Sequence, residues 1–159
     1  MNIKTLKRMG CCAIIAATFT ACNTTPDFKA VKKEVLNIHD KLMVDGEKVI
    51  KNRMILDTVL LSAQVKTAPD SALQKQKITE LITRLNQADE MMMDWMHEFK
   101  DDYAGKTEAQ NMAYYKSEMI KIRAVEDTYI KIIRESDSVL NVYKIKPGPA
   151  ATKNETHKH

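Results

Sequence analysis

The stretch ITELITRLNQADEMMMDWMHEF, residues 78–99, carries the most regular apolar pattern in the chain. Apolar side chains recur there at alternating steps of three and four residues, which places them on one face of an α-helix. Met93 and His97 lie more than about 100° from the centre of that face, at about 100° per residue, and are expected to point outward. The pattern predicts a helix from about Ser71 to Asp101. Its buried face comprises Ile78, Leu81, Leu85, Ala88, Met92, Trp95 and Phe99.

Two further helical segments flank this one, each separated from it by a turn. From Asp27 to about Lys66 the chain has no proline and one glycine, and apolar or small residues recur at helical spacing, so one long helix is expected. On the other side, Thr107 and Gln110 are spaced as a capping box, which opens a third helix running to about Tyr143. The expected buried face of this third helix comprises Met112, Tyr115, Met119, Ile122, Glu126, Tyr129, Ile133, Ser136, Leu140 and Tyr143.

The order of these segments predicts an all-α fold. Short turns between long helices make neighbours antiparallel, so residues 27–144 are expected to form an up-down-up three-helix bundle, followed by a disordered polar tail over 145–159. In that topology the first and second helices face each other where residue numbers sum to about 137, and the second and third where they sum to about 209. These sums predict which side chains share a level of the bundle.

The alignment predicts one ion pair inside the bundle. Arg53 falls within the apolar face of the first helix and Glu126 within that of the third, and neither residue type is common in a core unless it is paired. Under these sums their levels differ by about one residue. We therefore predict an Arg53–Glu126 ion pair that fixes the register of the two helices.

Residues 1–21 are typical of a lipoprotein signal peptide. Three basic residues precede an apolar segment that is too short to span a bilayer, and a site of small residues ends in Cys22. Phe19 and Thr20 depart from the commonest form of this site. We expect cleavage before Cys22, lipidation of Cys22, for example with palmitate, and a short tether over 22–26. An ordinary secretory signal or a short uncleaved anchor would also place the body of the protein outside the cytoplasm.

Removal of the signal peptide changes the charge balance. The whole chain has 25 Lys and Arg against 21 Asp and Glu, and three of the basic residues lie in the signal, which leaves 22 against 21. A nucleic-acid partner is therefore not expected, because such binding needs a basic surface. Cys11 and Cys12 also leave with the signal, so the mature domain must be stabilised by packing rather than by disulfides.

The predicted alignment gathers a histidine and several methionines at one end of the bundle. Thioether and imidazole groups are ligands that hold Cu(I), and an exported protein without free thiols would have to use them for that purpose. The candidate copper ligands are His39, Met43, Met92, Met96, Met112 and Met119. Methionine is also an adaptable core residue that packs well against aromatic rings, and core packing is the simpler interpretation. No other cofactor is indicated.

Other functional classes find less support in the sequence. Carboxylates and tyrosines are scattered along the predicted helices without a convergent acid–base pair, so enzymatic activity is not expected. The outward-pointing Met93 and His97, together with Tyr114 on the facing helix, are candidates for a protein-binding surface, because clustered exposed apolar groups mark interfaces.

Two short motifs carry a resemblance to a known group of proteins. They are HDKLM at residues 39–43 and MMMDWMHEF at residues 91–99. With these motifs the chain resembles small helical lipoproteins of the Bacteroidota, often labelled "viral A-type inclusion protein", whose function is unknown. The resemblance implies an envelope location and supplies no activity.

These observations together predict a lipid-anchored, non-enzymatic envelope protein that binds an envelope protein partner. The residues after Cys22 lack the acidic run associated with surface export in such bacteria, so the protein is expected to face the periplasm. The alternative is a periplasmic copper(I) binder.

Overall fold

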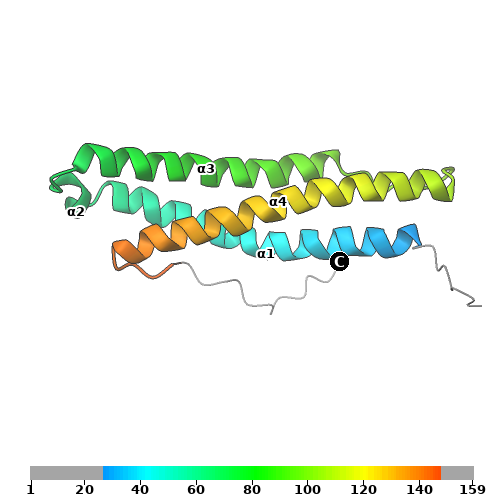
Figure 1. Cartoon of the computed structure of the whole chain (residues 1–159), viewed down its shortest axis with the longest axis horizontal. Coiled ribbons are helices and arrows are strands. Elements are labelled where there is room, and N and C mark those ends of the chain that lie inside the picture. The colour runs from blue at the N-terminus through cyan, green and yellow to red at the C-terminus, as the bar shows by residue number, and fades with distance from the viewer. Residues whose placement is uncertain (1–26, 148–159) are drawn as a thin grey trace, which may run out of the picture.

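The computed structural model describes residues 27–147, which are almost entirely helical. The helices are α1 (Phe28–Leu60), α2 (Ala63–Lys66), α3 (Ser71–Glu98) and α4 (Glu108–Val142), and the described residues contain no strand. Figure 1 shows α1, α3 and α4 side by side, with α3 antiparallel to the other two and α2 at one end. The predicted all-α class is confirmed.

Several predictions concern segments that the structure does not describe. The expected signal peptide over 1–21, the lipidation site Cys22 and the tether over 22–26 all lie outside residues 27–147. Within 27–147, no helix combines the length and the apolar character needed to cross a membrane.

The single long helix expected from Asp27 to Lys66 is broken in two. α1 ends at Leu60, and the Ser62 hydroxyl accepts a hydrogen bond from the Val65 amide to cap α2. Val65 is fully buried, yet it follows Leu56 by nine residues, so on a continuous helix it would point to the opposite side at about 100° per residue. The break turns Val65 into the core, which explains why the predicted continuation is wrong.

The core-facing side of α4 differs from the predicted face. The capping box at Thr107 and Gln110 is present, as predicted. However, Met112 and Met119 lie only at the edge of the core, as does Glu126. The buried residues of α4 are instead Asn111, Tyr115, Glu118, Ile122, Val125, Tyr129, Ile132, Ser136 and Leu140.

A polar layer in the core sets the register between α1 and α4. The Asn52 side-chain amide donates to Ser136 Oγ at 2.9 Å and to Asp137 Oδ1 at 2.8 Å, and Lys48 Nζ lies 2.6 Å from Asp137 Oδ2. Neighbouring pairs across the same seam include Lys41 with Glu126. Partners on the two helices are thus 84 to 89 positions apart along the chain.

The predicted Arg53–Glu126 ion pair is wrong. These two residues are 73 positions apart, so the observed register separates them by roughly 18 Å along the bundle at 1.5 Å per residue. Glu126 pairs with Lys41 and Arg123, and Arg53 lies 4.0 Å from Asp57 on its own helix.

The predicted register between α1 and α4 is wrong mainly because of the connection between α3 and α4, and less because of the connection between α1 and α3. Lys32 pairs with Asp101, numbers that sum to 133, close to the expected 137. Glu98 pairs with Lys121, numbers that sum to 219 rather than about 209. Residues 99–107 continue past the end of α3 instead of turning back at once, so α4 begins beyond that end, as Figure 1 shows.

The carboxyl end of α4 remains part of the packed domain. Lys144 adopts a left-handed conformation with φ of 58°, and the Ile145 amide donates to the Leu140 carbonyl at 3.0 Å, which is the pattern of a Schellman motif. Ile145 packs against the core, and the Tyr143 hydroxyl donates to Gln74 at 2.9 Å. The expected disordered tail therefore cannot begin at residue 145, whereas 148–159 lies outside the described residues.

Candidate functional site

The structure keeps part of the predicted histidine and methionine layer together. The His39 ring lies 5.6 Å from the Trp95 ring, centroid to centroid, which brings the α1 histidine against the middle of the 91–99 motif. Met92 is buried in the core and Met96 packs against it from the edge. The His39 Nδ1 atom is 3.0 Å from an Asp40 carboxylate oxygen, so its Nε2 atom is the nitrogen left for another contact.

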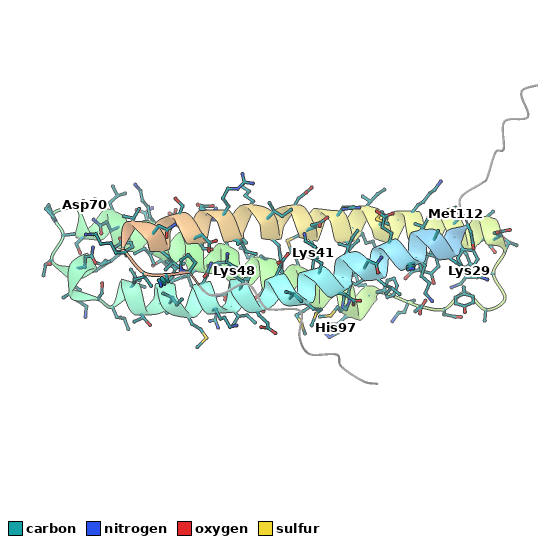
Figure 2. All side chains as sticks on the ribbon, turned by 90° about the horizontal axis from the view of Figure 1, so that it is seen from below. Lys29, Lys41, Lys48, Asp70, His97 and Met112 are labelled. Carbon is teal, nitrogen blue, oxygen red and sulfur yellow. The ribbon has the colours of Figure 1, made fainter. Side chains whose placement is uncertain are left out.

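The other three candidate ligands do not join this layer as predicted. Met43 is exposed. Met119 lies about 80 positions after His39 and Met112 fewer still, short of the 84 to 89 that separates level residues, so both are displaced toward the start of α1. Figure 2 shows Met112 at the end of the bundle that carries Lys29, far from the level of Lys41.

Fewer of the predicted copper ligands therefore remain candidates. His39, Met92 and Met96 are the three candidates that remain near one level. Within 27–147 no three His, Cys, Asp or Glu residues are grouped so that they could hold a metal ion. A soft-metal site at these three residues stays a hypothesis.

An aromatic cluster closes the end of the bundle from which the chain enters α1. We call it the aromatic end, and its members are Phe28, Trp95, Phe99, Tyr103, Tyr114 and Tyr115. Phe28 stacks on Tyr115 at 5.9 Å between centroids, and Trp95 stacks on Phe99 at 4.8 Å. Such pairs contribute about 0.5–1.5 kcal/mol each beyond burial, so this end is held by rings from α1, α3 and α4.

Polar contacts tie the aromatic end to the connection between α3 and α4. Asp101 lies 2.6 Å from Lys32 Nζ and accepts a hydrogen bond from the Tyr115 hydroxyl at 2.9 Å. The Lys32 ammonium, and secondarily the Tyr115 hydroxyl, hold the pKa of Asp101 below its ordinary value. Burial and the Asp101 carboxylate raise the pKa of Tyr115, so its hydroxyl stays protonated and available as a donor.

The sequence alone pointed to only part of this cluster. Trp95 and Phe99 stand out in the 91–99 motif, but Phe28 and Tyr103 lie at the ends of segments and carry no periodic signal. Tyr114 was expected on an outer surface. In the structure it is half-buried, and its hydroxyl accepts a hydrogen bond from the Lys100 amide at 2.6 Å.

Met93 and His97 are both exposed, as their positions on the helix predicted. The Met93 side chain is 45% exposed, which is high for a large apolar residue. Figure 2 shows His97 beside α1 at the level of Lys41. These two residues therefore form a surface at the seam between α1 and α3, separate from Tyr114.

A hollow of about 640 Å³ lies between α1 and α4 on another side of the bundle. It is open to solvent, and its charged lining includes Lys41 and Asp137, which are already engaged in ion pairs across the seam. Its apolar lining comes from Ile130 and Ile133. A shallow hollow with paired charges lacks the enclosed, convergent polar groups that distinguish a small-molecule site.

No protein-family model, curated protein or solved structure matches the chain. The resemblance to Bacteroidota lipoproteins thus stays a hypothesis that rests on the two short motifs. Function has to be argued from the geometry of the helices and their exposed side chains.

Proposed function

We propose that this protein is a lipid-anchored, non-enzymatic module of the cell envelope that faces the periplasm and binds another envelope protein. In this proposal an up-down-up three-helix bundle is attached to the membrane through Cys22. The observation that carries the proposal is the exposure of large apolar side chains on α1 and α3, with Met93 beside His97 at their seam. Exposed apolar groups that gather on one surface mark protein interfaces.

The position of the aromatic end agrees with anchoring at this end of the bundle. α1 begins at Phe28, six positions after Cys22, and Phe28 is fixed against Tyr115. A lipid on Cys22 would therefore hold the aromatic end within a short tether of the membrane, since six extended residues span at most about 20 Å. Met93 and His97 would then lie within reach of partners at the membrane surface.

A substitution at the lipidation site tests the anchoring half of the proposal. Cys22→Ser in the full chain should abolish incorporation of labelled palmitate and release processed protein from the membrane fraction. The matched control is Cys12→Ser, within the expected signal peptide, which should still be labelled. Unchanged labelling of the Cys22→Ser protein would refute the lipoprotein assignment.

Crosslinking in cells tests the partner-binding half. A photoreactive residue in place of Met93 should give one discrete adduct with another envelope protein. The same residue at Glu80, exposed on the same helix more than three turns away, should not give that adduct. If a photoreactive residue at position 93 gives no adduct under conditions in which one on α1 does, Met93 is not part of the binding surface.

A further inference from the structure

A second apolar stripe runs along α1 on the side that faces solvent. Its members are Met43, Ile50 and Met54 on α1 and Leu61 at the C-cap of α1, which are 48%, 39%, 58% and 69% exposed. At about 100° per residue these four positions fall within about 20° of one direction, roughly 120° from the core face. We call this set the α1 outer stripe, and it extends over roughly 27 Å at 1.5 Å per residue.

The spacing of the α1 outer stripe is that of a helix-pairing seam. Positions 43, 47, 50, 54, 57 and 61 follow one another at alternating steps of four and three residues. Four of the six are apolar, and the other two are Glu47 and Asp57. The core does not require this pattern, because Leu42, Val49 and Leu56 already form the buried face of the same helix.

The two acidic residues in the seam have only weak partners within the protein. Glu47 lies 3.5 Å from Lys51 and Asp57 lies 4.0 Å from Arg53, each one turn along the same exposed helix. Pairs of this kind contribute little and exchange readily with other charges. The seam therefore presents two carboxylates whose weak ion pairs with Lys51 and Arg53 can be exchanged for pairs with cations from outside.

These charges select among the occupants that could cover the stripe. In a parallel pairing with a second copy, Glu47 would meet Glu47, and in an antiparallel pairing it would meet Asp57, so like charges meet in both arrangements. A membrane surface is disfavoured as well, because Glu47 and Asp57 lie within the stripe, where anionic lipid would repel them, although Lys51 and Arg53 flank it. The mature segments outside the structure, 22–26 and 148–159, contain no large aliphatic or aromatic side chain that could fill the stripe.

We propose that the α1 outer stripe is the docking surface for an amphipathic helix of the partner protein, with apolar residues at three-four spacing and Lys or Arg opposite Glu47 and Asp57. The proposal rests on the proposed function and specifies the surface and the chemistry of the partner. The stripe begins with Met43 near the level of Met93 and His97, because His39 on α1 packs against Trp95 on α3. The two surfaces are therefore continuous, with the partner helix lying along α1.

Photocrosslinking along α1 tests this docking surface in the lipidated protein in its own membranes. A photoreactive residue at Ile50 or Met54 should give the same partner adduct as one at Met93, whereas one at Lys131, exposed on the outer face of α4, should not. Mass spectrometry of the adduct should place the link in a basic amphipathic helix. Reversing both charges, with Glu47→Lys and Asp57→Lys, should lower the adduct yield at Met54 at least tenfold while leaving the helical circular dichroism spectrum unchanged.

Each other outcome has a separate meaning. A link between two copies of this chain, or a link to lipid, at positions 50 and 54 would overturn the proposal in favour of self-association or membrane contact. An adduct at Met93 with none at Ile50 or Met54 would overturn it while leaving partner binding intact. No adduct at any of these sites would refute both the docking surface and the partner-binding function. An adduct at Met54 that survives the double charge reversal would refute the basic helix.

Discussion

Among substitutions of comparable size between α1 and α4, removal of the Asn52 side chain should lower the free energy of unfolding the most. Asn52 is fully buried, and its amide donates to Ser136 and to the Asp137 carboxylate. In Asn52→Ala both hydrogen bonds are lost, and the space between the helices must collapse or stay empty. Asp137 would keep only Lys48 as its partner.

The magnitude follows from the two contacts. A neutral hydrogen bond contributes about 0.5–1.5 kcal/mol and one to a charged group about 1.5–3 kcal/mol, while alanine regains up to about 0.7 kcal/mol of helix propensity. The free energy of unfolding should therefore fall by about 2–4 kcal/mol. A double-mutant cycle with Asp137→Ala should give a coupling energy of about 1–3 kcal/mol, because the two side chains touch.

Urea denaturation followed by circular dichroism of residues 23–159 measures these quantities, with the slope of the transition as a check on two-state behaviour. The matched control is Asn86→Ala, an exposed asparagine in the middle of α3, which should change the unfolding free energy by less than about 0.5 kcal/mol. A coupling energy below about 0.5 kcal/mol would mean that the polar layer does not set the register. The structural argument for the relative positions of α1 and α4 would then fail.

Three further predictions concern charge, backbone geometry and metal. Lys41, and secondarily Arg123, lower the pKa of Glu126 below its ordinary value, so its stabilisation is present above that value and is lost as the pH falls through the folded-state pKa. Glu126→Gln should therefore flatten the decline in unfolding free energy between about pH 5 and pH 3, and an unchanged slope would contradict this. Lys144→Gly should raise the unfolding free energy by about 0.5–1 kcal/mol, since glycine adopts the left-handed conformation without strain, and a loss of stability would refute the Schellman assignment. If the copper hypothesis holds, His39→Ala should lower Cu(I) affinity in competitive titrations about tenfold or more, while Met112→Leu should not.

The regular parts of the fold could be predicted because burial and helical period coincide there. All of Ile78, Leu81, Leu85, Ala88, Met92 and Trp95 lie in the core, as the 78–99 pattern indicates. The predicted buried face of α4 differs from the observed one because the prediction placed apolar residues in the core wherever the helical spacing allowed it. The structure instead buries Asn111 and Glu118, while their neighbours Met112 and Met119 lie at the edge of the core. Glu118 is accommodated by an ion pair with Lys121 at 3.0 Å, a contact that periodicity does not reveal.

The register could not be predicted from the lengths of the turns. Residues 101–106 were predicted as a short turn after a helix ending near Asp101, yet α3 ends at Glu98, Phe99 is extended and Tyr103 packs back on Phe28. The chain therefore continues past α3 before α4 begins. A connection of this composition can either turn back at the end of α3 or continue past it. The choice depends on tertiary contacts between aromatic side chains, such as Tyr103 with Phe28. This shift separated the predicted copper ligands on α4 from His39 and separated Arg53 from Glu126.

The same shift has a consequence for how the domain opens. α3 ends near the level of Lys121, so among the helices of residues 27–147 the first three turns of α4 have α1 alone as a neighbour. Amide hydrogens where two helices pack exchange through smaller openings than those where three helices pack, so we expect this segment to open at a lower free energy than the rest of the domain. If Cys22 is lipidated as proposed and the anchor pulls on the domain, the force is applied at Phe28 and reaches this segment first. Under such tension the aromatic end would separate while the polar layer around Asn52 keeps the remainder folded.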